Sequence, residues 1–368
     1  MTNSANQIIS PEEVKNKVRS LAEGSEKNVC VILGAGASSG YSKEDDAYAP
    51  PIVADLFDSN NRLVREVLLR HTFIDGQKPH IVRTLQRFNG DLEAYLTDLY
   101  TKDVEDNTFP ALLRYLEDIF HTASLRANLS DNNYQSLINI FRELRGKKPW
   151  SFLSFNYDTI LELSLIATPR FIVQRDFASK DSYLRATPKI LKMHGGVNYR
   201  YHIEELDEKR QRLSYHEVFT DMMDAKVPSD EYAQFIQPTS AIPNFSTRIG
   251  RQDGIVTIYD FPLMMIPIHG SVKPENSFFN DQIELAKKEI SESKLVIAIG
   301  YNFGDELFRK VIGELDLKEN ELILVGTHHL VTKTTEHLSY KNAAMIWPPK
   351  NISIFGGNGF GKFIEALY

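Results

Sequence analysis

The stretch Asn28-Val-Cys-Val-Ile-Leu-Gly-Ala-Gly-Ala-Ser38 joins a run of β-branched and apolar residues to a turn of glycine and alanine. Such a run predicts a buried strand that enters a tight turn. Small residues in the turn let backbone N–H groups approach a phosphate, and a helix that begins there would add its positive end. The common dinucleotide-binding fingerprint requires glycine where Ser39 stands, so a plain strand-to-loop turn stays open as the alternative.

Further apolar runs of strand length follow in the second half of the chain. Helical periodicity over Asp281–Ile290 and Asp305–Ile312 separates some of these runs from one another. Several runs would be apolar on both faces, as expected where helices cover both sides of a parallel sheet. The alternation predicts an α/β fold with a doubly wound, mostly parallel Rossmann-like sheet. The predicted strands are Ser151–Phe155, Phe171–Gln174, Ile190–Met193, Leu263–Ile268, Leu295–Ile299, Leu322–Val325 and Ile352–Phe355.

Two segments do not fit this alternation, and we interpret them as insertions into a single domain that spans residues 1–368. Residues 51–148 have helical periodicity, for example apolar side chains at i, i+4 and i+7 from Ile81, and carry no strand signal. They predict a large helical insertion between two strands of one sheet. Residues 199–262 are polar and only weakly periodic, so the sequence does not place this second insertion.

The composition restricts the classes of function. Of the 368 residues, 42% are hydrophobic and 25% are charged, which is typical of a globular protein and excludes a disordered or fibrous chain. The net charge of −7 lacks the basic footprint of a nucleic-acid-binding protein, so we expect no direct nucleic-acid binding. Cys30 is the one cysteine, which excludes a disulfide framework or a cysteine-based zinc cluster, and we expect no metal. Short apolar runs and an N-terminus without a signal-peptide pattern predict a cytoplasmic protein that does not contact membranes.

Three further motifs place polar residues where predicted strands end. They are Ser154-Phe-Asn-Tyr-Asp158, Lys192-Met-His-Gly-Gly196 and Ile299-Gly-Tyr-Asn-Phe-Gly-Asp305. In open parallel sheets the carboxyl ends of the strands form the ligand crevice. We therefore expect these three motifs and the glycine turn to converge on one crevice.

Each of the three motifs also has a plainer interpretation. Asp158 and Asp305 can cap the helices that follow them, and Asn156 can be a turn residue. A lone histidine such as His194 is more often structural than catalytic. A histidine side chain can, however, exchange a proton near neutral pH, and the glycines that follow this one would open space for a ligand.

Taken in order, these motifs resemble those of the sirtuin-like superfamily. The similarity rests on Gly34-Ala-Gly-Ala-Ser38, Phe155-Asn-Tyr-Asp158, Met193-His-Gly195 and Gly300-Tyr-Asn-Phe-Gly-Asp305. It is strongest to the divergent bacterial branch, which includes NAD-hydrolysing effectors of anti-phage defence. The resemblance implies a sirtuin-like fold and NAD+ as the substrate.

The resemblance also implies a role for each matched residue. Asn156 would hold the nicotinamide ribose and position a water molecule, and His194 would act as the general base. The glycine turn would bind the pyrophosphate, the motif at Gly300 would line the adenosine end, and Asp158 would shape the site. The implied NAD+-binding residues are Gly34, Ala35, Gly36, Ser38, Asp158, Gly300, Tyr301 and Asp305.

Two departures from the protein-deacylating sirtuins bear on the reaction. Residues 199–261 contain no cysteine and cannot form the four-cysteine zinc ribbon, and Asn156 and His194 lie 38 positions apart, a wider gap than in the deacylases. Both departures argue against a groove for an acyl-lysine peptide. Water is then the simplest nucleophile, which predicts a NAD+ glycohydrolase that releases nicotinamide and ADP-ribose.

Two other classes of function stay open. The chain can be a protein deacylase or ADP-ribosyltransferase of the sirtuin type, or a non-catalytic subunit that binds NAD+ or ADP-ribose in a defence complex. The resemblance further implies a homo-oligomer, with a partner ATPase such as a HerA-type translocase or another defence subunit.

Overall fold

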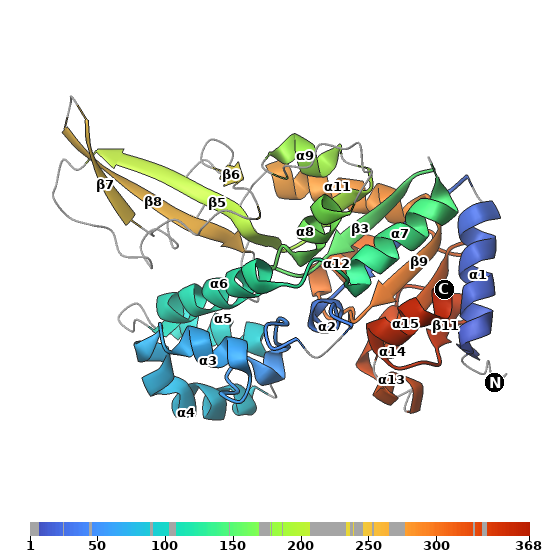
Figure 1. The fold of residues 1–368 in the computed structure, drawn as a ribbon, viewed down its shortest axis with the longest axis horizontal. Helices are drawn as coiled ribbons and strands as arrows, with labels where there is room; N and C mark the ends of the chain where they lie inside the picture. Colours follow the sequence, from blue (N-terminus) through green and yellow to red (C-terminus); the bar gives the residue numbers. More distant parts are fainter. Residues whose placement is uncertain are drawn as a thin grey trace.

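The segment that begins at Asn28 forms strand β2 (Asn28–Leu33) of a seven-stranded sheet in the computed structural model (Figure 1). All neighbouring strands of this sheet are parallel, in the order β1-β11-β10-β9-β2-β3-β4. The other strands are β1 (Gln7–Ile9), β3 (Trp150–Ser154), β4 (Lys189–Lys192), β9 (Ser293–Ile299), β10 (Glu321–Val325) and β11 (Ile352–Phe355).

The structure describes residues 7–24, 26–43, 46–88, 91–102, 108–146, 148–168, 177, 179–185, 187–206, 233–235, 238, 246–251, 254–264, 277–326, 328–332 and 337–368. The strand predicted at Phe171–Gln174 lies outside these residues.

Helices cover both faces of the parallel sheet. Along β2, Val29, Val31 and Leu33 pack into one apolar cluster, whereas Cys30 and Ile32 pack into the other. The alternation confirms the predicted doubly wound α/β fold, because each strand buries side chains on both sides. The first face carries α1 (Pro11–Gly24), α7 (Asn133–Arg145), α8 (Ile160–Ala167) and α15 (Gly359–Leu367), and the second carries α11 (Ser277–Ser291), α12 (Glu306–Gly313), α13 (His328–Thr332) and α14 (Leu338–Ala343).

The winding of the chain reverses in the middle of the sheet. From β2 the chain proceeds outward through β3 to β4, and from β9 it proceeds in the opposite direction through β10 to β11. Strands β2 and β9 are neighbours, so the reversal lies between them. In open α/β sheets, ligands bind outside the carboxyl ends of the strands at such a switch point.

Strand β1 was not predicted from the sequence. Its three residues pair with β11 at the edge of the sheet. A strand of this length is too short for an alternation of apolar and polar residues to be visible in the sequence. It leads directly into α1, whose start is fixed by reciprocal hydrogen bonds. The Ser10 N–H donates to Glu13 Oε2 at 2.7 Å, and the Glu13 N–H donates to Ser10 Oγ at 3.3 Å.

The segment between β2 and β3 is helical, as its periodicity predicts. Buried residues of these helices, including Leu63, Leu112 and Ile119, belong to the same apolar cluster as one face of the sheet. The helices therefore share a core with the sheet. They are α2 (Ala35–Ser39), the 3₁₀ turn η1 (Val53–Asp55), α3 (Arg62–Leu68), α4 (Thr72–Arg87), α5 (Leu92–Lys102), α6 (Thr108–Arg126) and α7.

The segment that the sequence did not place contributes a four-stranded antiparallel sheet with the order β6-β5-β8-β7. Figure 1 shows this sheet extending away from the β4 edge of the parallel sheet. We predicted that Leu263–Ile268 forms a strand of the parallel sheet. This prediction is wrong for Leu263 and Met264, because they end the antiparallel strand β8. Residues 265–268 lie outside the described residues. The strands are β5 (Gly195–Leu206), β6 (Ala233–Phe235), β7 (Ser246–Arg251) and β8 (Gly254–Met264).

Candidate functional site

The four motifs singled out in the sequence lie at the carboxyl ends of four consecutive strands, β9, β2, β3 and β4. Backbone hydrogen bonds continue from strand to strand just beyond these ends. The Gly34 N–H donates to Ile299 O at 3.0 Å, and the Phe155 N–H donates to Leu33 O at 2.9 Å. The Met193 N–H donates to Ser154 O at 2.9 Å in the same way. The motifs are therefore side by side, and the glycine turn lies at the switch point between β2 and β9.

The glycine turn packs tightly against the loop after β9. A Cβ atom on Gly34 would lie 2.5 Å from Gly300 O, and one on Gly300, where φ is +59°, would lie 2.4 Å from Ala37 N. The N–H groups of Gly34, Gly36 and Ala37 all donate to backbone carbonyl oxygens of the protein. In this conformation these three groups are engaged within the protein, so the glycines here serve the contact between two loops, and the pyrophosphate role of the turn stays a prediction.

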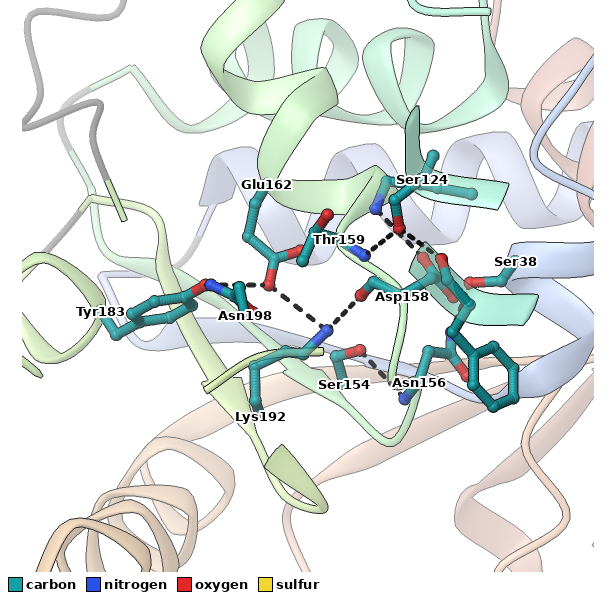
Figure 2. Close-up of polar contacts among 12 residues, drawn as sticks. Ser38, Ser124, Ser154, Asn156, Asp158, Thr159, Glu162, Tyr183, Lys192 and Asn198 are labelled. Carbon is teal, nitrogen blue, oxygen red and sulfur yellow. Dashed lines mark hydrogen bonds and ion pairs between the residues drawn. The ribbon is translucent and has the colours of Figure 1, made fainter. Parts of the chain in front are cut away.

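Asn156 is held by the glycine turn. Its Nδ2 donates to Gly34 O at 3.0 Å and to Ser38 Oγ at 2.9 Å, and its backbone N–H donates to Ser154 Oγ at 3.2 Å (Figure 2). Both hydrogens of the amide nitrogen are thereby used, and 7% of the residue is exposed. Oδ1, an acceptor, is consequently the atom of this amide that can receive a hydroxyl group or a water molecule.

Tyr134 of helix α7 also reaches this cluster, and the sequence did not suggest it. Its hydroxyl lies 3.1 Å from Ser38 Oγ. Burial raises the pKa of Tyr134 well above its ordinary value, so the phenol stays protonated at neutral pH. The ring also lies edge-on to Phe360 at 5.4 Å, as a core aromatic would. From sequence the residue has the pattern of an ordinary buried position on an amphipathic helix.

His194 is paired with Asp305. Its Nε2 lies 2.6 Å from Asp305 Oδ2, and both side chains are about nine-tenths buried. The Phe308 N–H donates to Asp305 Oδ1 at 2.8 Å, so the same carboxylate caps helix α12 and orients the imidazole. The rings of Phe155 and Tyr157 lie 5.1 Å and 6.0 Å from the imidazole. The adenosine role of Asp305 stays a prediction, while its contact with His194 is a feature that the sequence did not indicate.

Asn156 and His194 contact different partners, and among the contacts that the structure gives for the described residues none joins them directly. Their backbone positions are nevertheless equivalent. Ser154 and Lys192 are partners in the register of β3 and β4, and Asn156 and His194 each follow two residues later. The two side chains thus leave neighbouring strands at the same level of the carboxyl edge.

Tyr301 packs as a core residue beside the imidazole. Its ring stacks on that of Phe155 with 4.1 Å between centroids, and it contacts Phe303 at 4.9 Å. The residue is 9% exposed. Its role at the adenosine end of NAD+ stays a prediction. In this structure the ring packs against Phe155, which in turn contacts the imidazole of His194.

Asp158 and Lys192 form a second polar cluster beneath the turn. Asp158 Oδ1 accepts from the Ile160 N–H at 3.1 Å, two residues along the turn that leads into α8, whose N-cap residue is Thr159. Lys192 Nζ donates to the backbone carbonyl of Asp158 and lies 3.3 Å from Glu162 Oε1 (Figure 2). The sequence analysis missed Lys192 and Glu162. Their signal is a charged residue at the end of the short strand Lys189-Ile-Leu-Lys192 and another within a largely apolar helix.

Within the part of the chain that the structure describes, no three His, Cys, Asp or Glu side chains form a group able to hold a metal ion. Of the helices that the structure describes, none is both long enough and apolar enough to cross a membrane.

Neither a protein-family model nor a curated protein matches this chain. Several solved structures of Sir2 and sirtuin proteins are similar to it at low identity. A Sir2 homologue in complex with NAD is 10% identical with a TM-score of 0.47, and the alignment covers 99% of this chain and 97% of that one. A sirtuin structure that addresses substrate affinity is 13% identical with a TM-score of 0.40, covering 95% of each chain. Similarity at this level identifies neither the family nor the activity of the chain.

Proposed function

We propose that this protein is a NAD+ glycohydrolase that cleaves NAD+ to nicotinamide and ADP-ribose. One observation carries the proposal: the glycine turn, Asn156, His194 and Asp305 lie together at the carboxyl edge, around the switch point of a doubly wound sheet. This is the position at which open α/β sheets bind nucleotides. The order and identity of the four motifs, which resemble those of the sirtuin-like superfamily, support NAD+ as the nucleotide.

The contacts of Asn156 suit it to hold a ribose. Gly34 O and Ser38 Oγ take both hydrogens of Nδ2, so the amide cannot rotate without losing two hydrogen bonds. A fixed Oδ1 can accept from a ribose hydroxyl or from an attacking water. Such pre-organised polar groups stabilise a transition state more than mobile ones do.

The contact of His194 suits it to accept a proton. Asp305 bonds Nε2, which leaves Nδ1 as the ring nitrogen that can face a substrate. A carboxylate on one ring nitrogen fixes the orientation of the imidazole and the tautomer that it presents. His194 would therefore take a proton from a ribose hydroxyl or from water.

The reaction needs little else from the protein. The bond that breaks joins C1′ of the ribose to the pyridinium nitrogen, and neutral nicotinamide leaves with the electron pair. Water oxygen forms the new bond to C1′ and loses one proton to the base. The protein must stabilise the oxocarbenium-like transition state and present the water, and no strong acid is required because the leaving group is already cationic.

The proposal extends to the biological role. The same resemblance supports an effector of bacterial anti-phage defence that acts by depleting NAD+. It also supports a homo-oligomer and a partner ATPase of the HerA type or another defence subunit, with an activity that is restrained until a trigger is sensed.

The test is to incubate the purified full-length protein with NAD+ and quantify nicotinamide and ADP-ribose. Asn156→Ala and His194→Ala should each lower the rate by about a hundredfold or more without unfolding the protein. His80→Ala, on the exposed face of α4, is the matched control and should keep the parental rate. A parental rate in either site variant would remove that residue from the mechanism.

The products separate the alternatives. Turnover that depends on an acylated peptide would indicate a deacylase, and ADP-ribose attached to protein would indicate a transferase. Binding of NAD+ without product, both in vitro and in bacterial cells that express the protein during phage infection, would indicate a non-catalytic subunit. A fall in cellular NAD+ that His194→Ala prevents is the result expected of a glycohydrolase effector.

A further inference from the structure

We propose that Lys192 is a positioning residue, which ties the turn between β3 and α8 to the end of β4 and so sets Asn156 and His194 relative to each other. The inference rests on the proposed function, because it concerns how the same site is held in shape. It assigns a role to the lysine and to the second glycine of the motif Lys192-Met-His-Gly-Gly196, neither of which the proposed chemistry uses.

The register of the sheet puts Lys192 level with Ser154, two residues before the level of the two candidate catalytic residues. It pairs with Ser154 across β3 and β4, two residues before His194. Its side chain then crosses to the neighbouring segment, where Nζ donates to the backbone carbonyl of Asp158 (Figure 2). Asp158 lies two residues after Asn156. One side chain thus connects the segment that carries Asn156 to the strand that carries His194.

The lysine is held at the other side by a carboxylate. Glu162 Oε1 lies 3.3 Å from Lys192 Nζ, and neither side chain is exposed to solvent. Glu162 Oε1 also accepts from the Tyr183 hydroxyl at 3.2 Å, and Asn198 Nδ2 donates to that hydroxyl at 2.6 Å. Burial raises the pKa of Glu162, and the charge of Lys192 opposes this effect.

Buried charges of this kind seldom stabilise a fold more than apolar residues of the same volume would. The site of this pair therefore calls for an explanation other than stability. The explanation that its contacts give is geometric, because an ammonium group restrained by a carboxylate can hold a backbone carbonyl at a fixed place.

The backbone around Lys192 is shaped to admit it. A Cβ atom on Gly196 would lie 3.1 Å from Asn198 Oδ1, 3.2 Å from Lys192 Cε and 3.2 Å from Tyr157 O. The Val197 N–H donates to Tyr157 O at 2.9 Å, so the start of β5 closes over the lysine and the turn together. Gly196, which the sequence suggests would open space for a ligand, makes room here for the lysine.

The experiment compares two pairs of substitutions on the same strand. Lys192→Met/Glu162→Gln removes both charges at the carboxyl end of β4, so no carboxylate is left buried without its cation. Lys189→Met/Glu289→Gln removes the ion pair at the amino end of β4 and is the matched control. Gly196→Ala is the second test variant, since it displaces Lys192 while keeping every charge.

The two readouts are NAD+ turnover and backbone hydrogen exchange over residues 156–160. In Lys192→Met/Glu162→Gln we expect kcat to fall by about tenfold to a hundredfold because of a displaced reactive geometry. KM should change by less than about threefold, and exchange in the turn should accelerate by about tenfold. Gly196→Ala should change both readouts in the same direction, and the control pair should change neither.

Parental kcat in both test variants, or unchanged exchange in both, overturns the positioning role. The positioning role is also overturned if the control pair loses kcat and exchange protection, because the effect would then be one of general stability. If the parental protein converts no NAD+ in vitro or in infected cells, the proposed function fails by itself. The exchange measurement then still decides whether Lys192 holds the turn.

Discussion

Strand β4 has a lysine at each end, and each lysine forms an ion pair with a glutamate. At the amino end, Lys189 contacts Glu289 with 31% of the lysine side chain exposed. At the carboxyl end, Lys192 contacts Glu162 and neither side chain is exposed. The difference teaches that, of the two ion pairs of β4, the wholly buried one lies at the edge where the four motifs meet, and the partly exposed one lies at the opposite edge.

The amino edge also has a buried charge, Arg145, of which 2% is exposed. Arg145 donates to the backbone carbonyls of Ala22, Lys27 and Pro149 at 2.6, 2.7 and 2.8 Å. These bonds tie together the end of α1 and the starts of β2 and β3. They hold elements in place, whereas the polar contacts of the carboxyl edge hold the candidate site.

The largest effect is expected from single substitutions of the two lysines. Lys192→Met leaves Glu162 buried without a cation and should lower the free energy of unfolding by about 3–5 kcal/mol. Lys189→Met should cost less, about 1–3 kcal/mol, because the lysine is partly exposed and the buried Glu289 keeps its hydrogen bond from Asn28. Urea denaturation at neutral pH measures both, and equal losses would break the contrast between the edges.

A smaller effect is expected from glycines. Gly300→Ala puts a Cβ atom 2.4 Å from Ala37 N at a positive φ, so it should destabilise the protein by about 3 kcal/mol. Gly313→Ala, at the other end of α12, meets no atom within 4 Å and should change stability by about 0.5 kcal/mol or less. Thermal unfolding of the two variants checks this. A tolerated Gly300→Ala would mean that the two loops can separate, which would free the glycine turn for a phosphate.

The smallest effect concerns pH and lies away from both edges. Burial lowers the pKa of His121 of α6 to about 4. The charge of Asp118 opposes this shift, and the charges of Arg200 and Arg70 add to it. In the unfolded chain His121 binds a proton near pH 6.5, whereas in the folded protein it stays neutral down to about pH 4. The contribution of the neutral histidine to the free energy of unfolding is therefore complete above pH 6.5 and is lost as the pH falls towards 4. Between pH 7 and pH 5 the loss should be about 2 kcal/mol.

His121→Gln should remove most of that pH dependence, and His80→Gln, on an exposed position of α4, should leave it unchanged. Urea denaturation at the two pH values gives the difference. If the parental protein and His121→Gln lose stability equally, the acid sensitivity belongs elsewhere. The measurement also shows how much of any fall in NAD+ turnover at low pH is caused by loss of stability and how much by a change in the candidate site.

Much of the parallel sheet could be predicted because its strands are continuous apolar runs that few other structures accommodate. The segment at Leu295–Ile299 and the glycine turn at Gly34 gave such signals by themselves. The antiparallel strands were not predicted, since Asp260 and Pro262 interrupt the apolar residues of β8 (Gly254–Met264) and charged residues interrupt those of β5 (Gly195–Leu206). The two strands are specified by pairing with each other over about fifty intervening residues.

The candidate site could be predicted only as far as its motifs. Strand ends give the positions of Asn156 and His194, but the partners of their side chains depend on which distant segments become neighbours. Asp305 follows β9, which lies two strands beyond β3 in the sheet, and it still contacts His194. Tyr134 comes from a helix of the insertion. Local patterns contain no information of this kind, which is why no role of its own was predicted for Lys192.

The residues of the candidate site are spread over most of the chain, from Gly34 to Asp305 of 368 positions. A ribosome must therefore translate about 270 residues after the glycine turn before the histidine can meet its carboxylate. For a protein proposed to consume NAD+, this arrangement withholds a complete site until Asp305 has been synthesised.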